Sequence, residues 1–136
     1  MRQAPKADFF VFARVLVGDD TYMRLPFYHD KENYIGPEKW TSQHKLRWLA
    51  RFARYADGID LNLAGWLHDG LYSLGGTEED RERADEKFAK AMEWLIANAH
   101  GGRIRKWLAR IRASAYFEFV RLAGAVFFSY GRMTLP

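Results

Sequence analysis

The side chains that could do chemistry lie in two short stretches, one around a histidine and one around an aspartate. His68 and Tyr72 are four residues apart, so in a helix they lie on the same face. Asp85 borders an apolar stripe, and a carboxylate that leaves water needs a partner to offset its desolvation. A carboxylate bound to one ring nitrogen of a histidine fixes the tautomer, so that the other nitrogen can act as a general base. The residues therefore indicate either acid–base catalysis or a satisfied polar cluster that only fixes the packing of two helices.

Two helices, expected over residues 61–74 and 77–99, must position these side chains. Glycines at 75 and 76 end the first helix, and Thr77 followed by three acidic residues is typical of a helix N-terminus. A connection this short favours antiparallel packing. His68 lies about two turns before the connection and Asp85 about two turns after it. The sequence therefore predicts that the two side chains meet across the helix pair.

The motifs around these residues resemble those of a known enzyme superfamily. HDGLY at 68–72, ADEKF at 84–88 and GGRI at 101–104 are similar to the HDxxY, ADxxF and GG-x-[IL] elements of the phospholipase A2 superfamily. The likeness is greatest to the cysteine-free phospholipase domain of parvovirus capsid proteins. HDxLY followed by ADxxF also resembles a domain of unknown function that is common in tailed-phage genomes. The resemblance covers about residues 55–125.

The resemblance implies a phospholipase A2-like hydrolase, encoded by a phage, that cleaves phospholipid esters with the help of calcium. His68 would be the general base, and Asp85 would accept a hydrogen bond from its other ring nitrogen. Tyr72 would join the same network, and Asp69 would be a calcium ligand. The alternative is a non-enzymatic virion or assembly protein of a phage, with virion proteins as partners, that keeps the helix pair for structure.

The same resemblance points to a loop that would complete the calcium site. The string YIGP at 34–37 matches the start of the parvoviral YLGP loop, so backbone carbonyls of Tyr34 and Gly36 become candidate ligands. Glu38 and Lys39 follow where the family usually has a second glycine nearby. Residues 57–60, with the sequence DGID, are a rival for the same role.

Composition limits the fold and the chemistry. The 136 residues are 49% hydrophobic with a net charge of +4, which is typical of one globular domain. Cysteine is absent, which excludes disulfides, thiolate zinc sites and a cysteine nucleophile. We expect neither a signal peptide nor a membrane-spanning helix. The resemblance to phage proteins implies a location in the virion or the host cytoplasm. His29, His44 and His100 do not have the spacing of metal ligands.

The expected architecture is mostly α-helical, a compact bundle of four or five helices in a single domain over 1–136. Residues 1–39 are expected to form an irregular segment with a short strand near residues 22–25, and the apolar run 8–17 suits a buried helix or a strand equally. Residues 40–136 form the helical core. Its helices are expected at 41–56, 61–74, 77–99 and 103–130.

The start of the last helix is basic on one side and apolar on the other. Its basic residues are Arg103, Arg105, Lys106, Arg110 and Arg112, and its apolar residues are Ile104, Trp107, Leu108 and Ile111. Such a helix suits a phospholipid membrane surface, contacted through Arg103, Arg105, Lys106, Trp107 and Arg110. Nucleic acid is the least favoured partner, because only residues 103–112 suggest it. The other interpretation is an ordinary bundle helix whose apolar side faces the core.

Overall fold

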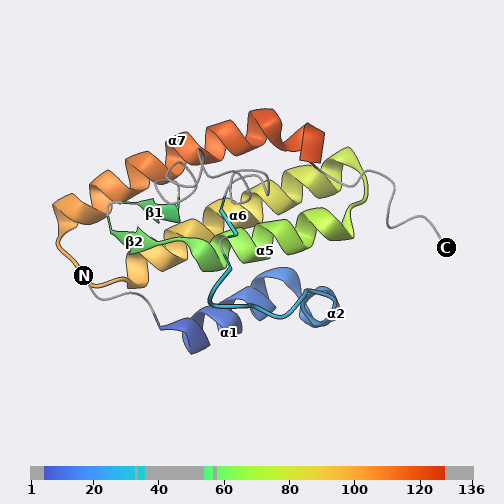
Figure 1. The fold of residues 1–136 in the computed structure, drawn as a ribbon, viewed down its shortest axis with the longest axis horizontal. Helices are drawn as coiled ribbons and strands as arrows, with labels where there is room; N and C mark the ends of the chain where they lie inside the picture. Colours follow the sequence, from blue (N-terminus) through green and yellow to red (C-terminus); the bar gives the residue numbers. More distant parts are fainter. Residues whose placement is uncertain (1–4, 33, 36–53, 57, 128–136) are drawn as a thin grey trace.

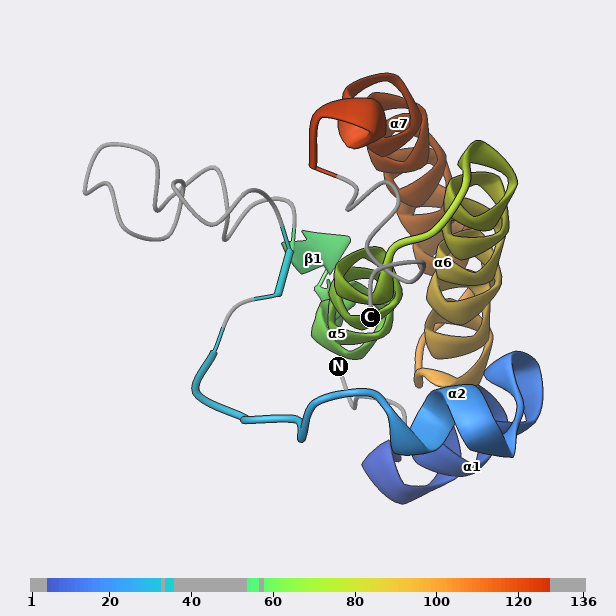
Figure 2. The same cartoon turned by 90° about the vertical axis from the view of Figure 1, so that its right-hand side faces the viewer.

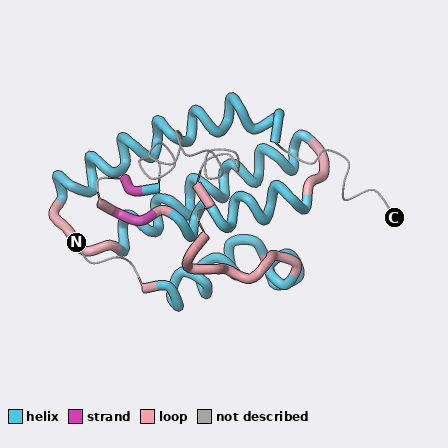
Figure 3. Tube along the Cα trace, viewed as in Figure 1, coloured by secondary structure: helices cyan, strands magenta, loops and turns pink. Residues whose placement is uncertain are grey.

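The computed structural model describes residues 5–32, 34–35, 54–56 and 58–127. Within these ranges the chain is mostly helical, as expected. The elements are α1 (Lys6–Val17), α2 (Asp19–Met23), β1 (Tyr55–Ala56), β2 (Ile59–Asp60), α5 (Asn62–Leu74), α6 (Glu78–Asn98) and α7 (Arg103–Phe127). Helices α5, α6 and α7 lie side by side, and short loops join them (Figures 1 and 3). Helix α6 is central, because it contacts α5, α7 and α1.

The turn between α5 and α6 forms as the sequence predicts. Gly75 and Gly76 both have positive φ, and a Cβ atom at Gly76 would lie 2.2 Å from the Asp80 carboxylate. Thr77 and Asp80 form a reciprocal capping box. The Asp80 amide donates to the Thr77 hydroxyl (3.2 Å), and the Thr77 amide donates to the Asp80 carboxylate (2.9 Å). This tight connection confirms the antiparallel helix pair.

The apolar run near the N-terminus forms the helix α1, which settles the choice between helix and strand. One face of α1 is buried through Phe9, Ala13 and Val17. The rings of Phe9 and Phe12 lie 5.6 Å and 5.4 Å from the ring of Trp94 on α6. A helix presents all of these side chains to one neighbour, because they recur at spacings of three and four residues.

Two expected elements differ in the structure. The strand near residues 22–25 is wrong, because Asp19–Met23 form the short helix α2, which two acidic residues in its first turn favour. The helix expected to reach residue 56 does not include Tyr55–Ala56, because these residues pair with Ile59–Asp60 as a hairpin around Gly58, which has φ of 85°. The remainder of that helix, 41–53, and residues 128–130 of the last one lie outside the described residues.

The segment after α2 runs back beneath α5 in Figure 1 and loops out to one side of it in Figure 2. The indole of Trp66 donates to the Pro26 carbonyl (2.9 Å), and Leu25 packs against Gly70. Further on, the amide of Tyr34 donates to the side chain of Asn62 (2.7 Å). This irregular segment therefore covers α5 along its length.

Candidate active site

His68 on α5 and Asp85 on α6 meet across the helix pair, as predicted. His68 Nε2 lies 2.9 Å from Asp85 Oδ1. Both residues are buried, with exposed fractions of 7% and 2%. The contact follows from the tight turn, which brings residues about two turns away on either side to the same level.

Asp85 also accepts hydrogen bonds from two other side chains. The Tyr72 hydroxyl donates to Oδ1 (2.6 Å), and Arg81 Nη1 donates to Oδ2 (3.3 Å). Burial, and then the neighbouring carboxylate, raise the pKa of Tyr72, so its hydroxyl stays a proton donor. With these donors around it, the Asp85 carboxylate acts as a hydrogen-bond acceptor. His68 Nε2, which faces this carboxylate, is therefore the ring nitrogen that carries the proton.

The other ring nitrogen of His68, Nδ1, is not fully buried. Nδ1 makes no hydrogen bond with the described residues, and those residues contain no fully buried side-chain nitrogen or oxygen atom that lacks a partner. The Nδ1 atom must therefore be partly accessible to water. Burial lowers the pKa of His68, although Asp85 opposes this effect, so the ring is neutral at pH 7. An uncharged, water-accessible Nδ1 has the lone pair that a general base needs.

Aromatic rings fix the plane of the imidazole. The ring centroids of Tyr72 and Phe88 lie 4.1 Å and 4.5 Å from that of His68. The Tyr72 ring lies one turn along α5 and the Phe88 ring one turn beyond Asp85 on α6, and both are tilted against the imidazole. These contacts limit rotation of the His68 side chain, so Nδ1 keeps its direction.

Arg81 is a member of this cluster that the sequence analysis missed, because it lies among the acidic residues at the start of α6. Its Nε donates to Glu78 (3.0 Å), and its Nη1 reaches both Asp85 and the Arg121 carbonyl of α7 (3.3 Å). The signal was the spacing of four residues between Arg81 and Asp85, which puts both on one helix face.

The chain near Tyr34 crosses α5 one turn before Asp69. A Cβ atom at Gly65 would lie 2.6 Å from both the Tyr34 carbonyl oxygen and Ile35 Cδ1, so the crossing requires a glycine. Asn62 holds the segment from inside, since its amide nitrogen donates to the Tyr28 hydroxyl and the Glu32 carbonyl. Asp69 is exposed and lies four residues after Gly65, on the same face of α5.

The other residues considered as calcium ligands give less support to a calcium site. Gly36 lies outside the described residues. The described part of the chain contains no group of three or more His, Asp or Glu side chains that could hold a metal ion. In the rival segment, Asp60 binds Arg54 through two hydrogen bonds of 2.8 Å and also accepts from the Asn62 amide. Asp60 therefore has a structural role at the start of α5.

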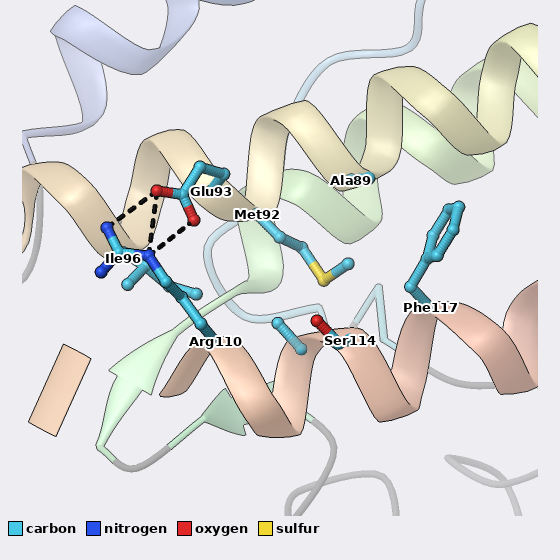
Figure 4. A pocket seen from close by; sticks show the side chains of 8 residues that line it. Ala89, Met92, Glu93, Ile96, Arg110, Ser114 and Phe117 are labelled. Atoms are coloured by element: carbon cyan, nitrogen blue, oxygen red, sulfur yellow. Dashed lines mark hydrogen bonds and ion pairs between the residues drawn. The ribbon is translucent and has the colours of Figure 1, made fainter. Parts of the chain in front are cut away.

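A shallow hollow of about 210 Å³ lies between α6 and α7, away from His68 (Figure 4). The ion pair of Glu93 and Arg110 closes one end, with nitrogen–oxygen distances of 2.8–3.0 Å. Its lining residues are Ala89, Met92, Glu93, Ile96, Arg110, Ala113, Ser114 and Phe117. The hollow is smaller than most pockets that hold a drug-sized ligand.

Two basic residues of α7 bind α6. Lys106 donates to the Ala97 carbonyl (2.9 Å), and Arg110 binds Glu93, so both side chains bind α6. Trp107 is exposed, and so are Arg103 and Arg105. No helix in the described part of the chain is long and apolar enough to cross a membrane.

Comparisons with models of protein families, with curated proteins and with solved structures found no match for this chain.

Proposed function

We propose that the protein is a phospholipase A2-like hydrolase, encoded by a phage, that cleaves the carboxylic esters of phospholipids with the assistance of calcium. The observation that carries the proposal is the orientation of His68. Its Nε2 is bound to the buried Asp85, and its Nδ1 makes no hydrogen bond with the described residues. The motifs around both residues, which resemble those of phospholipases A2, supply the substrate class.

The reaction begins with a water molecule hydrogen-bonded to His68 Nδ1. The water oxygen attacks the ester carbonyl carbon while its proton moves to Nδ1, which gives a tetrahedral oxyanion and an imidazolium. Asp85 stabilises the imidazolium through Nε2. When the intermediate collapses, the bond to the alcohol oxygen breaks and that oxygen takes the proton from Nδ1. The products are a fatty acid and a lysophospholipid, and His68 is neutral again.

The calcium ligands under this proposal are the carboxylate of Asp69 and the backbone carbonyls of Tyr34 and Gly36. Calcium prefers such hard oxygen ligands, and the Tyr34 carbonyl packs against α5 one turn from Asp69. The described donors therefore fit calcium in kind. The bound ion would polarise the ester carbonyl and stabilise the oxyanion.

The test is release of fatty acid from phospholipid vesicles by the purified protein, with calcium and with a chelator. We expect release with calcium, and loss of at least about 99% of it in His68→Gln, because removal of a general base costs on the order of a hundredfold or more. His100→Gln is the matched control, since His100 is exposed and lies at the end of α6. Circular dichroism verifies that each variant folds. Absence of release from neutral and anionic lipids at every calcium concentration would overturn the proposal.

A second candidate is a non-enzymatic virion or assembly protein in which the cluster serves only structure. The burial of His68 and Asp85 favours it, because a satisfied buried network can fix how two helices pack without catalysing anything. In that case the wild-type protein releases no fatty acid. His68→Gln would still lower the free energy of unfolding by about 1–3 kcal/mol, since Asp85 loses a buried donor.

A further inference from the structure

Large apolar side chains line the outward face of α7. Ala109 and Ala113 are buried, and the apolar residues on the opposite side of the helix are exposed. Their exposed fractions are 76% for Ile104, 59% for Trp107, 41% for Leu108, 49% for Ile111, 45% for Phe119 and 84% for Leu122. The interpretation of this side as core is therefore wrong, because small alanines occupy the positions against α6.

The outward face has the residue spacing of a coiled coil. From Ile104 the steps along it are four, three, four, three and four residues, and they lead to Leu108, Ile111, Ala115, Glu118 and Leu122, which are all exposed. We call these six residues the α7 seam. Side chains that repeat about every 3.5 residues form a narrow stripe that packs into the matching stripe of a second helix. Helix α7 lies at the edge of the helix layer in Figures 1 and 2, with α6 on its inner side.

The basic side chains of α7 give little support to the membrane surface that the sequence suggested. Lys106 and Arg110 bind α6. Arg105 and Arg112 also have interaction partners within the chain. Most of the positive charge at 103–112 is therefore engaged, and what the helix presents to a partner is the seam. A stripe this narrow fits another helix better than a flat surface.

The single acidic residue of the seam selects how two such helices can pair. In a parallel pair, Glu118 would lie against Glu118 of the second copy, and like charges in contact are unfavourable. In an antiparallel pair centred on residue 113, Glu118 lies level with Leu108 of the second copy. That part of the helix, 103–112, contains no acidic residue. The charge of the seam is therefore complementary to itself in the antiparallel arrangement.

The sizes of the seam residues match in the same arrangement. The steps of four and three residues read the same in both directions, so each seam residue meets a seam residue of the second copy. Ile104 lies level with Leu122, and Ile111 lies level with Ala115, so that a large side chain fills the space beside a small one. A parallel pair would put Ala115 against Ala115 and leave a gap. Size and charge thus favour one and the same partner, a second copy of this chain.

We propose that the protein forms a twofold homodimer in which the α7 seams of two copies pack as a short antiparallel coiled coil. Trp107 of each copy comes beside Arg121 of the other, where the guanidinium and the indole attract each other. Arg81 binds both Asp85 and the Arg121 carbonyl, so the interface adjoins the part of α7 that contacts the candidate active site. The dimer rests on the exposure and spacing of α7 and is independent of whether the protein is an enzyme.

Sedimentation equilibrium over a range of protein concentrations measures the dimer directly. The double variant Ile104→Asn/Ile111→Asn should raise the dissociation constant about tenfold or more, because two apolar side chains of each copy no longer leave water. The matched control is Val11→Asn/Val15→Asn on α1, where both side chains are also exposed. It should change the constant less than about twofold. Circular dichroism verifies that each variant folds.

Introduced cysteines measure the orientation of the two copies, because the chain contains no cysteine of its own. After mild oxidation, a mixture of the Ile104→Cys and Leu122→Cys proteins should form disulfide-linked pairs that contain one chain of each. Leu122→Cys alone should link far less, because the two copies of residue 122 lie about 27 Å apart in the antiparallel pair.

A chain that stays monomeric at every concentration up to about 1 mM would overturn the proposal. Equal effects of the α7 and α1 variants on the dissociation constant would also overturn it, and so would Leu122→Cys linking to itself as readily as to Ile104→Cys. Binding of a monomeric chain to phospholipid vesicles or to duplex DNA, lost in the α7 double variant, would assign the seam to that partner and contradict the dimer.

Discussion

The burial of His68 couples protonation of its ring to the stability of the fold. The folded protein lowers the pKa of His68, so the unfolded chain takes up a proton at a higher pH than the folded one. Above pH 6.5, the ordinary pKa of histidine in an unfolded chain, His68 is neutral in both the folded and the unfolded state, so its protonation no longer affects stability. As the pH falls below 6.5, the unfolded state binds the proton first and stability decreases.

Urea denaturation at pH 7.5 and 5.5 tests this coupling. We expect the wild-type protein to lose more unfolding free energy between these pH values than His68→Gln does, because glutamine has no proton to bind. His100→Gln, at an exposed histidine, is the control for the substitution itself. An equal loss in the wild-type and His68→Gln proteins would contradict the direction of the pKa shift.

Arg81 is predicted to support Asp85 and to tie α6 to α7. Arg81→Met removes the donor to Asp85 and to the Arg121 carbonyl and should lower the unfolding free energy by about 1–3 kcal/mol. The control Arg83→Met lies on the same helix, with 63% of its side chain exposed, and its surface ion pairs should contribute less than about 1 kcal/mol. Equal effects in thermal or urea unfolding would show that Arg81 has no special role.

At the scale of elements, Gly65 fixes how closely the chain at Tyr34 approaches α5. Alanine normally stabilises a helix relative to glycine, but here its Cβ would lie 2.6 Å from the Tyr34 carbonyl oxygen. We therefore expect Gly65→Ala to destabilise the protein by about 1–3 kcal/mol in urea unfolding. Gly102→Ala has open space around its Cβ and should be nearly neutral. A neutral or stabilising Gly65→Ala would contradict the close crossing.

The helices that carry the site could be predicted because their signals are local. Thr77 and its acidic neighbours specify a helix start, and paired glycines specify the stop before it, so the meeting of His68 and Asp85 followed from counting turns. The hairpin at 55–60 was missed because two-residue strands depend on pairing with each other. The exposure of Ile104 and Ile111 was missed because helical periodicity identifies an apolar face without telling which neighbour covers it.

At the scale of the whole molecule, bound calcium should stabilise the folded state, because its proposed ligands Tyr34 and Asp69 are far apart in the sequence and an unfolded chain holds no such site. Millimolar calcium should raise the melting temperature, and magnesium should do so less, because magnesium demands a stricter octahedral geometry. Asp69→Asn should remove most of the shift, whereas Asp20→Asn on α2 should leave it unchanged. Identical melting curves with calcium and with chelator would contradict the calcium site.

The account depends most on the state of one imidazole, which long-range ¹H–¹⁵N spectra of the protein labelled at histidine measure directly. At pH 7 we predict that His68 is neutral, with its proton on Nε2 and an unprotonated Nδ1, and that its pKa lies below 6.5. A proton on Nδ1, or a pKa at or above 6.5, would contradict a general base held by Asp85.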